Sequence, residues 1–288
     1  MERIKEAIER AKAQRDGLHQ AAAPVRRSAP AAALQSVAAT VVAAAPEPRE
    51  TPVPPREAEL LSPRHLEAKR VVAHQPNNPF AAPFDVLRTK ILQEMDSKGW
   101  QVLVVTSPTA NCGKTVTAVN LAFSIARHEE RSVVLVDLDL RKPQVAETLG
   151  LKGAAKIEGL MAGRLTVSDA MATVDAEGQR IDVLASRGPV QGASDVIASR
   201  QIKDLVLELR RLPGRPVIVV DMPPLFVSDD VLAFLPLADC AVLAAAERRS
   251  TVSDVETSEQ LLAEANLIGI VLTKSFDRSE AYNYSSYY

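Results

Sequence analysis

The chain has 288 residues, of which 47% are hydrophobic and 24% are charged, and its formal net charge is -2. This balance fits one packed soluble domain with some chain outside it, and it gives no overall attraction to nucleic acid, so no nucleic-acid partner is expected. Two cysteines, Cys112 and Cys240, lie far apart in the sequence, which argues against a disulfide framework and favours a reducing compartment.

The segment 1–76 is predicted to lie outside the packed domain. Residues 1–20 begin with a dense run of charges and a narrow apolar stripe, which indicates a short helix that is either simply solvated or a docking peptide for another protein. Residues 21–76 are rich in alanine and proline and are predicted to form a flexible linker. The longest weakly polar run, 31–45, is shorter than the roughly 20 residues that a membrane span needs, so no direct membrane span is expected.

From residue 77 to residue 278 the sequence alternates between apolar, β-branched runs and segments with helical spacing. The expected strands are Val102–Val105, Val133–Val136, Ile181–Leu184, Val217–Val220, Cys240–Leu243 and Ile268–Leu272. The expected helices between them include Lys114–Arg127, Ser194–Arg211 and Ser253–Ala265. Near-continuous apolar strands that alternate with helices are typical of a parallel sheet covered on both faces. We therefore expect a doubly wound α/β domain with a mostly parallel sheet and helices on both faces, followed by a tyrosine-rich tail at 279–288.

A phosphate-binding loop is predicted directly after the first of these strands. Strand, loop, Gly-Lys-Thr at 113–115 and helix follow one another, which is the context of a P-loop. Backbone N–H groups at such a helix start point at phosphate oxygens, the lysine neutralises the phosphates, and the threonine hydroxyl binds Mg²⁺. Pro108 stands where the first glycine is usual, and Asn111 is a residue type that tolerates a positive φ. The predicted nucleotide-binding residues of this segment are Thr109, Ala110, Asn111, Cys112, Gly113, Lys114, Thr115 and Val116.

Three aspartates follow two of the apolar strands. One strand ends in Asp137-Leu138-Asp139 and another ends in Asp221. Ligands of open α/β sheets lie beyond the carboxyl ends of the strands, so these carboxylates are expected beside the phosphate loop. Mg²⁺ prefers one or two carboxylates together with phosphates and water. The alternative is that each aspartate caps the next helix, but three of them downstream of a phosphate loop favour a metal site formed by Thr115, Asp137 and Asp221.

The set Gly-Lys-Thr at 113–115, Asp137-x-Asp139-x-Arg141-x-Pro143 and Asp221-x-Pro223-Pro224 resembles the bacterial tyrosine kinase (BY-kinase) family. Members of this family are co-regulators of capsule and exopolysaccharide biosynthesis and have a P-loop NTPase fold. The similarity extends over about residues 80–288 and includes the tyrosine-rich end. The Asp-x-Asp-x-Arg element separates the family from the partitioning and septum-positioning ATPases that share its fold.

The resemblance implies an ATP-dependent protein-tyrosine kinase that uses Mg²⁺. It implies that Lys114, Asp137 and Asp139 are catalytic, with one of the two aspartates activating a tyrosine hydroxyl, and that Arg141 belongs to the nucleotide site. A polar terminal segment cannot bury four aromatic rings, which favours a substrate tail over a tail that merely adheres through its rings. The implied phosphate acceptors, modified mostly by a neighbouring subunit, are all four tyrosines of the chain: Tyr282, Tyr284, Tyr287 and Tyr288.

The partner of this family is a membrane regulator of polysaccharide chain length, so the resemblance implies a cytoplasmic protein held at the inner membrane through that partner. The helix that forms the family's ring carries Glu-x-x-Arg-x-x-Arg, whereas the same frame here reads Ala82-x-x-Asp85-x-x-Arg88, so we expect a homo-oligomer that is weak without the partner. The last strand ends in Thr273-Lys274 in place of the family's Asn-Arg. These departures keep open an alternative, which is a partitioning-type ATPase or pseudokinase adaptor that switches partners with bound nucleotide.

Overall fold

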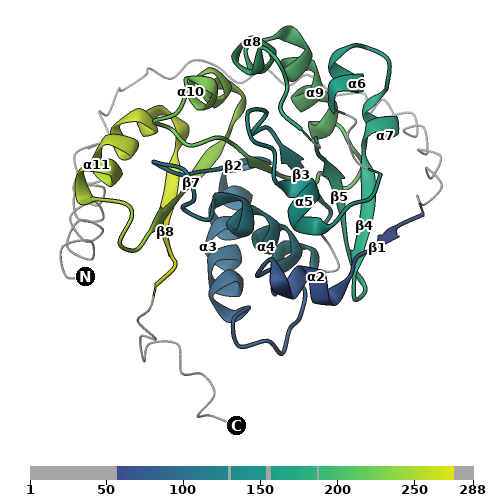
Figure 1. Cartoon of the computed structure of the whole chain (residues 1–288), viewed down its shortest axis with the longest axis horizontal. Helices are drawn as coiled ribbons and strands as arrows, with labels where there is room; N and C mark the ends of the chain where they lie inside the picture. The colour runs from purple at the N-terminus through teal and green to yellow at the C-terminus, as the bar shows by residue number, and fades with distance from the viewer. Residues whose placement is uncertain (1–56, 129–130, 154–156, 187, 276–288) are drawn as a thin grey trace, which may run out of the picture. The chain divides into compact units, whose positions relative to one another are not determined.

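The computed structural model describes residues 57–128, 131–153, 157–186 and 188–275 (Figure 1). The helix predicted within 1–20, most of the predicted linker and the tyrosine tail at 279–288 lie outside these residues. Within the described ranges, the structure contains no helix with the length and apolarity that a membrane crossing requires.

Eight strands of the described residues form one sheet, in the order β1-β4-β5-β3-β6-β2-β7-β8. Neighbouring strands are parallel except β4 and β5, which are antiparallel. The strands are β1 (Glu59–Leu60), β2 (Val102–Thr106), β3 (Val133–Asp137), β4 (Ala172–Ala176), β5 (Gln179–Leu184), β6 (Val217–Asp221), β7 (Cys240–Ala246) and β8 (Leu267–Thr273). The predicted mostly parallel sheet is confirmed.

Helices cover both faces of this sheet (Figure 1). Along β2, Leu103 and Val105 enter one apolar cluster with residues of α3 and α4, whereas Val102 and Val104 enter a second cluster with residues of α9. Because the central strands are buried on both faces, they read as continuous apolar runs. The helices are α2 (Pro63–Ala68), α3 (Ala82–Lys98), α4 (Lys114–Ala126), α5 (Val145–Leu149), α6 (Ile157–Met161), α7 (Val167–Ala170), α8 (Ala193–Ile197), α9 (Arg200–Arg210), α10 (Asp230–Phe234) and α11 (Val252–Leu261), with the 3-10 turns η1 (Leu235–Leu237) and η2 (Ala263–Ala265).

The structure departs from the predicted elements at the edge of the sheet and inside two helices. Strands β1 and β4 were not predicted, because β1 has two residues and β4 reads Ala-Thr-Val-Asp-Ala, and neither is an apolar run. The single helix predicted at Ser194–Arg211 is divided into α8 and α9, since the Ser199 side chain accepts a backbone N–H and starts a new helix there. The helix predicted at Ser253–Ala265 is likewise divided into α11 and η2.

The packed domain begins earlier than the predicted start at residue 77. Residues 57–76, here called the N-terminal strap, run along the sheet edge and the helical layer (Figure 1). Leu66, Val71 and Ala73 are completely buried and belong to the same apolar cluster as α3 and α4. The prediction that the flexible linker extends to residue 76 is therefore wrong for the strap, because its few apolar side chains reach the core despite the polar residues around them.

One buried side chain of α4 holds the strap. Asn120 Oδ1 accepts the backbone N–H groups of Val72 and Ala73 at 2.8 and 2.9 Å, and Asn120 Nδ2 donates to the carbonyl of Arg70 at 2.9 Å. The Asn120 side chain is fully buried, so these bonds have no competition from water. The strap also meets α5, where His65 Nε2 lies 2.8 Å from the carbonyl oxygen of Glu147.

We predict that Asn120→Ala lowers the free energy of unfolding by about 2–4 kcal/mol, because two N–H groups of the strap, one buried and one part-buried, lose their acceptor. Urea unfolding curves of the variant and the wild type measure this difference. Asn77→Ala, which alters an exposed asparagine just after the strap, is the control and should change the midpoint little. Equal midpoints for Asn120→Ala and the control would contradict the role assigned to Asn120.

Candidate nucleotide-binding site

The predicted phosphate loop lies between the end of β2 and the start of α4. Asn111 has φ 61° and Gly113 has φ 84°, so the backbone is left-handed at both positions. Glycine adopts this conformation at little cost and asparagine is among the next most tolerant residue types, which explains how a loop with one glycine can curl. Gly113 immediately precedes α4, and the helix therefore begins at Lys114.

The loop has the features of an anion cradle. In the described part of the chain, no hydrogen bond uses the backbone N–H groups of residues 110–113 as donors. The first N–H groups of α4 lack partners within the helix, as at every helix start. Successive N–H donors at a helix N-terminus bind phosphate oxygens well, so the residues present fit the phosphates of a nucleotide.

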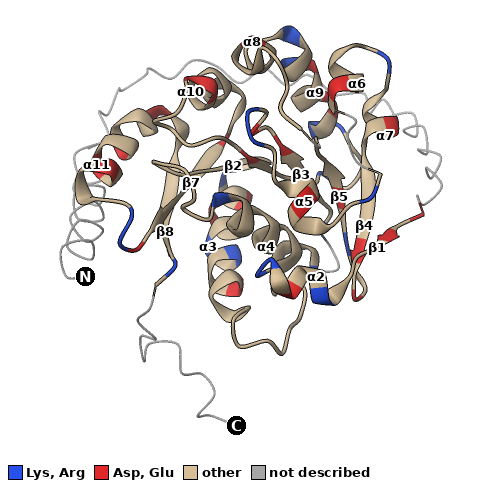
Figure 2. Ribbon diagram, viewed as in Figure 1, with Lys and Arg blue, Asp and Glu red and all other residues tan. Residues whose placement is uncertain are grey.

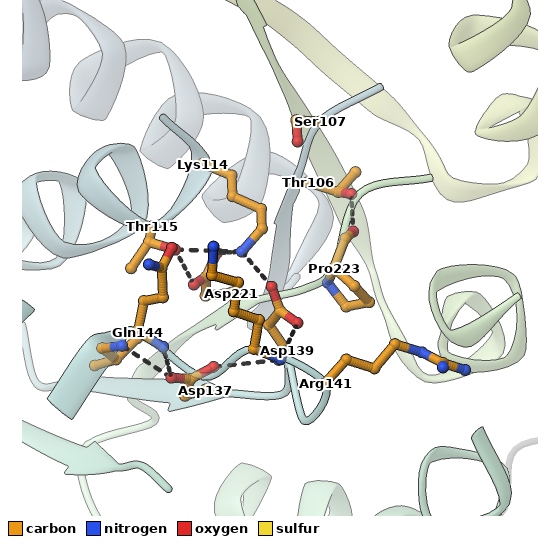
Figure 3. A network of polar contacts seen from close by, with 12 residues as sticks. Thr106, Ser107, Lys114, Thr115, Asp137, Asp139, Arg141, Gln144, Asp221 and Pro223 are labelled. Carbon is orange, nitrogen blue, oxygen red and sulfur yellow. Dashed lines mark hydrogen bonds and ion pairs between the residues drawn. The ribbon is translucent and has the colours of Figure 1, made fainter. Parts of the chain in front are cut away.

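A cluster of one lysine, one threonine and two aspartates lies beside the loop (Figure 3). Lys114 Nζ is 2.7 Å from Asp139 Oδ2 and 3.4 Å from Asp221 Oδ1. Thr115 Oγ1 donates to Asp221 Oδ2 at 2.6 Å. All four side chains are buried. The structure therefore brings together four residues that the sequence predicted from three separate motifs.

Asp137 lies next to this cluster but uses its carboxylate differently. It pairs in register with Asp221 across β3 and β6. Its Oδ2 accepts the N–H groups of Gln144 and Val145 at 3.0 and 2.9 Å, and its Oδ1 accepts the N–H of Asp139 at 3.2 Å (Figure 3). Asp137 therefore makes the contacts that the alternative interpretation predicted: its carboxylate caps the following helix and holds the start of α5.

The described residues contain no group of three or more histidine, cysteine, aspartate or glutamate side chains arranged to hold a metal ion. A magnesium ion at this site would therefore need phosphate oxygens and water besides protein ligands, as Mg²⁺ usually does. Thr115 and Asp221, already joined by a hydrogen bond, are the pair best placed to contribute. The role of Asp137 as a metal ligand stays a prediction.

The cluster contains more carboxyl groups than basic groups. Burial raises the pKa of Asp137 and the nearby Asp221 raises it further, against the Val145 N–H and Lys114, so the pKa lies well above the usual range. Burial likewise raises the pKa of Asp221, against Lys114 and the Thr115 hydroxyl. Burial lowers the pKa of Lys114, but Asp221 and Asp139 outweigh this and raise it overall. Lys114 is therefore charged, and the surplus of carboxylates favours an added cation.

Arg141 does not join the phosphate loop in this structure. Its side chain extends away from Lys114 (Figure 3), and its Nε donates to Asp230 Oδ2 at 2.9 Å while its Nη2 donates to Ser194 Oγ at 2.7 Å. Asp230 is completely buried at the start of α10. Arg141 thus links the acidic loop after β3 to α8 and α10, and its predicted contact with the nucleotide stays a prediction.

The remaining predicted residues divide into two groups. Thr109, Ala110, Cys112 and Val116 all lie in the loop or the first turn of α4. The four tyrosines of the tail lie outside the described residues.

Two residues of the site were not predicted from the sequence. The backbone N–H of Gln144 donates to Asp137. Thr106 Oγ1 donates to the carbonyl of Pro223 at 2.7 Å, which joins the ends of β2 and β6. No side-chain motif marks the Gln144 contact, because it is made by a backbone N–H group.

The fold and this cluster define a P-loop protein of the nucleotide-binding α/β class. Residues 103–286 match CbiA, the CobQ/CobB/MinD/ParA nucleotide binding domain. Because this match extends over more than half of the chain, the chain belongs to that family.

Relatives with assigned names support a closer resemblance. The putative tyrosine-protein kinase CapB of Staphylococcus aureus is 25% identical over 216 residues, covering 74% of this chain and 92% of CapB. The putative tyrosine-protein kinase EpsB of Ralstonia solanacearum is 26% identical over 227 residues, which are 78% of this chain but only 29% of EpsB. The crystal structure of the chimerical protein CapA2B2 matches with a TM-score of 0.63 and 27% identity, covering 76% of this chain and 93% of that one. The resemblance to bacterial tyrosine kinases is confirmed.

Lys114→Met should destabilise the protein in a pH-dependent way when metal and nucleotide are absent. Buried carboxylates that lose their cation have higher pKa values folded than unfolded, so the stability of the variant falls as the pH rises. We expect a deficit in the free energy of unfolding of about 3–5 kcal/mol at pH 8 that narrows towards pH 5. Urea unfolding at both pH values tests this, with the exposed Lys90→Met as control. A deficit that is the same at both pH values would show that the pKa values of these carboxylates do not depend on Lys114.

Arg141→Met is expected to lower the free energy of unfolding by about 1–3 kcal/mol, because Asp230 stays buried with fewer donors. Affinity for Mg-ADP, measured by calorimetry, should stay within about threefold of the wild type. Arg200→Met, which removes an exposed arginine of α9, controls for the loss of charge. The reverse pattern, unchanged stability with a large loss of affinity, would place Arg141 at the nucleotide.

Proposed function

We propose that this chain is an ATP-dependent protein-tyrosine kinase that phosphorylates its C-terminal tyrosine cluster in the regulation of exopolysaccharide or capsule biosynthesis. The observation that carries the proposal is the buried cluster of Lys114, Thr115, Asp139 and Asp221 next to a loop with unpaired N–H donors. The names of the relatives support tyrosine as the acceptor. Positioning and charge stabilisation supply most of the catalysis in phosphoryl transfer, and this cluster offers both.

ATP supplies the phosphoryl group. The N–H groups of the loop bind its phosphates and Lys114 adds positive charge. Thr115 and Asp221 would hold Mg²⁺, which would neutralise part of the phosphate charge. The tyrosine oxygen forms a bond to the γ-phosphorus, the bond from that phosphorus to ADP breaks, and the phenolic proton passes to a carboxylate. We assign this base to Asp139, because its carboxylate accepts one backbone N–H, from Lys142, and otherwise pairs with Lys114, whereas the carboxylate of Asp137 accepts three backbone N–H groups.

The proposed setting follows from the resemblance. The partner is a membrane regulator of polysaccharide chain length, which would hold this chain at the cytoplasmic face of the inner membrane. The proposed acceptors are the tail tyrosines of a neighbouring subunit. Phosphorylation adds about -1.5 to -2 charges per tyrosine, so a phosphorylated tail is repelled by the acidic cluster and by bound nucleotide and should leave the site.

The test is phosphotyrosine formation by the purified full chain with Mg-ATP, mapped by mass spectrometry. We expect phosphate on Tyr282, Tyr284, Tyr287 and Tyr288 in the wild type and a loss of about 100-fold or more in Lys114→Met and Asp139→Asn. Lys90→Met controls for a lost lysine. A variant with all four tail tyrosines changed to phenylalanine should bind Mg-ATP normally and take up no phosphate.

Two outcomes would overturn parts of the proposal. Full phosphate uptake in the four-fold phenylalanine variant would show that the tail is not the acceptor. Nucleotide binding or hydrolysis without any phosphotyrosine would favour the alternative function, a nucleotide-dependent switch that changes partners without transferring phosphate to tyrosine.

A further inference from the structure

Three carbonyl groups of the phosphate loop accept hydrogen bonds from side chains, one within the loop and two from residues far along the chain. Ser107 Oγ donates to the carbonyl of Thr109 at 2.8 Å. Arg249 Nη1 donates to the carbonyl of Ala110 at 3.3 Å. Thr273 Oγ1 donates to the carbonyl of Cys112 at 2.6 Å, the shortest of the three bonds.

The direction of these carbonyls determines where the loop presents its donors. In a planar trans peptide, the C=O of one residue and the N–H of the next point in opposite directions. Holding the carbonyl of Cys112 outward therefore turns the N–H of Gly113 inward, and holding that of Ala110 does the same for Asn111. None of the hydrogen bonds in the described residues takes these two N–H groups as donors. The hydrogen bonds to the outward-facing carbonyls thus orient the N–H donors that face into the loop.

Thr273 is itself firmly placed. It is the last residue of β8, pairs with Ala246 of β7, and its carbonyl accepts the N–H of Glu247 at 3.0 Å. Its hydroxyl hydrogen can form one strong hydrogen bond. The 2.6 Å contact with the carbonyl of Cys112 is shorter than the 3.3 Å contact with the carbonyl of Ala245, so the bond to Cys112 is the strong one. A Cβ added at Gly113 would lie 3.5 Å from Thr273 Cβ, so the Thr273 side chain lies directly against the loop here.

A second anchor fixes the same part of the loop. The Cys112 side chain is completely buried, with its Sγ 3.6 Å from Ser250 Oγ. Ser250 Oγ in turn accepts the N–H of Ala246 at 3.1 Å, which ties it to the end of β7. The ends of β7 and β8 therefore hold both the backbone and the side chain of Cys112.

We propose that Thr273 is a positioning residue for the phosphate loop, with Arg249 in a secondary role, and that it orders a loop in which Gly113 is the one glycine. The proposal rests on the proposed nucleotide site. Thr273 acts through the loop backbone, and its contribution appears in nucleotide affinity. A hydrogen bond of this kind contributes about 1–1.5 kcal/mol, which corresponds to roughly a tenfold change in affinity.

The experiment compares Thr273→Val, which keeps the shape but removes the donor, with Thr273→Ser, which keeps the donor. Calorimetry with Mg-ADP should show binding about tenfold weaker for the valine variant and within about twofold of the wild type for the serine variant. In the kinase assay, KM for ATP should rise more than kcat falls. The melting temperatures of the two nucleotide-free variants should be alike. Thr89→Val, at an exposed threonine of α3 whose hydroxyl also donates to a backbone carbonyl, is the matched control.

The possible failures are distinguishable. Wild-type affinity in Thr273→Val, or equal losses in the valine and serine variants, would overturn the positioning role and leave the proposed nucleotide site in place. Absence of Mg-ADP and Mg-ATP binding in the wild type would overturn the nucleotide site together with the positioning role. Arg249→Gln should weaken binding by about two- to threefold, because its bond is longer and more exposed; a larger loss than in Thr273→Val would make Arg249 the principal tether.

Discussion

A single buried ammonium group, Lys114 Nζ, lies among carboxylates at the carboxyl edge of the sheet, and the surrounding structure is arranged around that charge. Removing a charged group from water costs several kcal/mol unless partners replace the water. Here β3 and β6 are paired in register so that Asp137 and Asp221 lie side by side, and α4 brings Lys114 and Thr115 against them. The excess of carboxyl groups over basic groups makes the cluster receptive to a cation, which links the stability of the cluster to its proposed chemistry.

The supports of this cluster come from distant parts of the chain. The N-terminal strap is bound by Asn120 of α4, the helix that begins with Lys114, and by Glu147 of α5, the helix whose start is held by Asp137. The phosphate loop is held by Arg249, which follows β7, and by Thr273 at the end of β8. Residues near both ends of the described domain therefore contact the elements that carry the site. Each of these contacts supports the site indirectly, by holding a backbone group or a helix in place.

Helix α3 carries charges of both signs (Figure 2), and two of its charged residues, Asp85 and Arg88, are paired within the chain. Asp85 accepts hydrogen bonds from Ser124 at 2.7 Å and from Arg127 at 2.9 Å, and Arg88 lies 3.2 Å from the same carboxylate. A contact with another subunit through Asp85 or Arg88 would have to replace these bonds. This arrangement agrees with the expectation of weak self-association, which stays a prediction.

Local pattern and spacing were enough to predict the sheet class and six of the strands, because a strand buried on both faces must be apolar. They also predicted the segments that form the site, because phosphate binding needs a lysine and free N–H groups at a helix start. The sequence could not show which side chains meet. Asp137 and Asp139 are two residues apart, yet one caps α5 and the other binds Lys114, while Arg141 turns to a buried aspartate of α10. The strap and the Thr273 tether could not be predicted either, since three scattered apolar residues or one hydroxyl carry no periodic signal. Such contacts join residues far apart in the chain, and only the packing of the whole domain decides them.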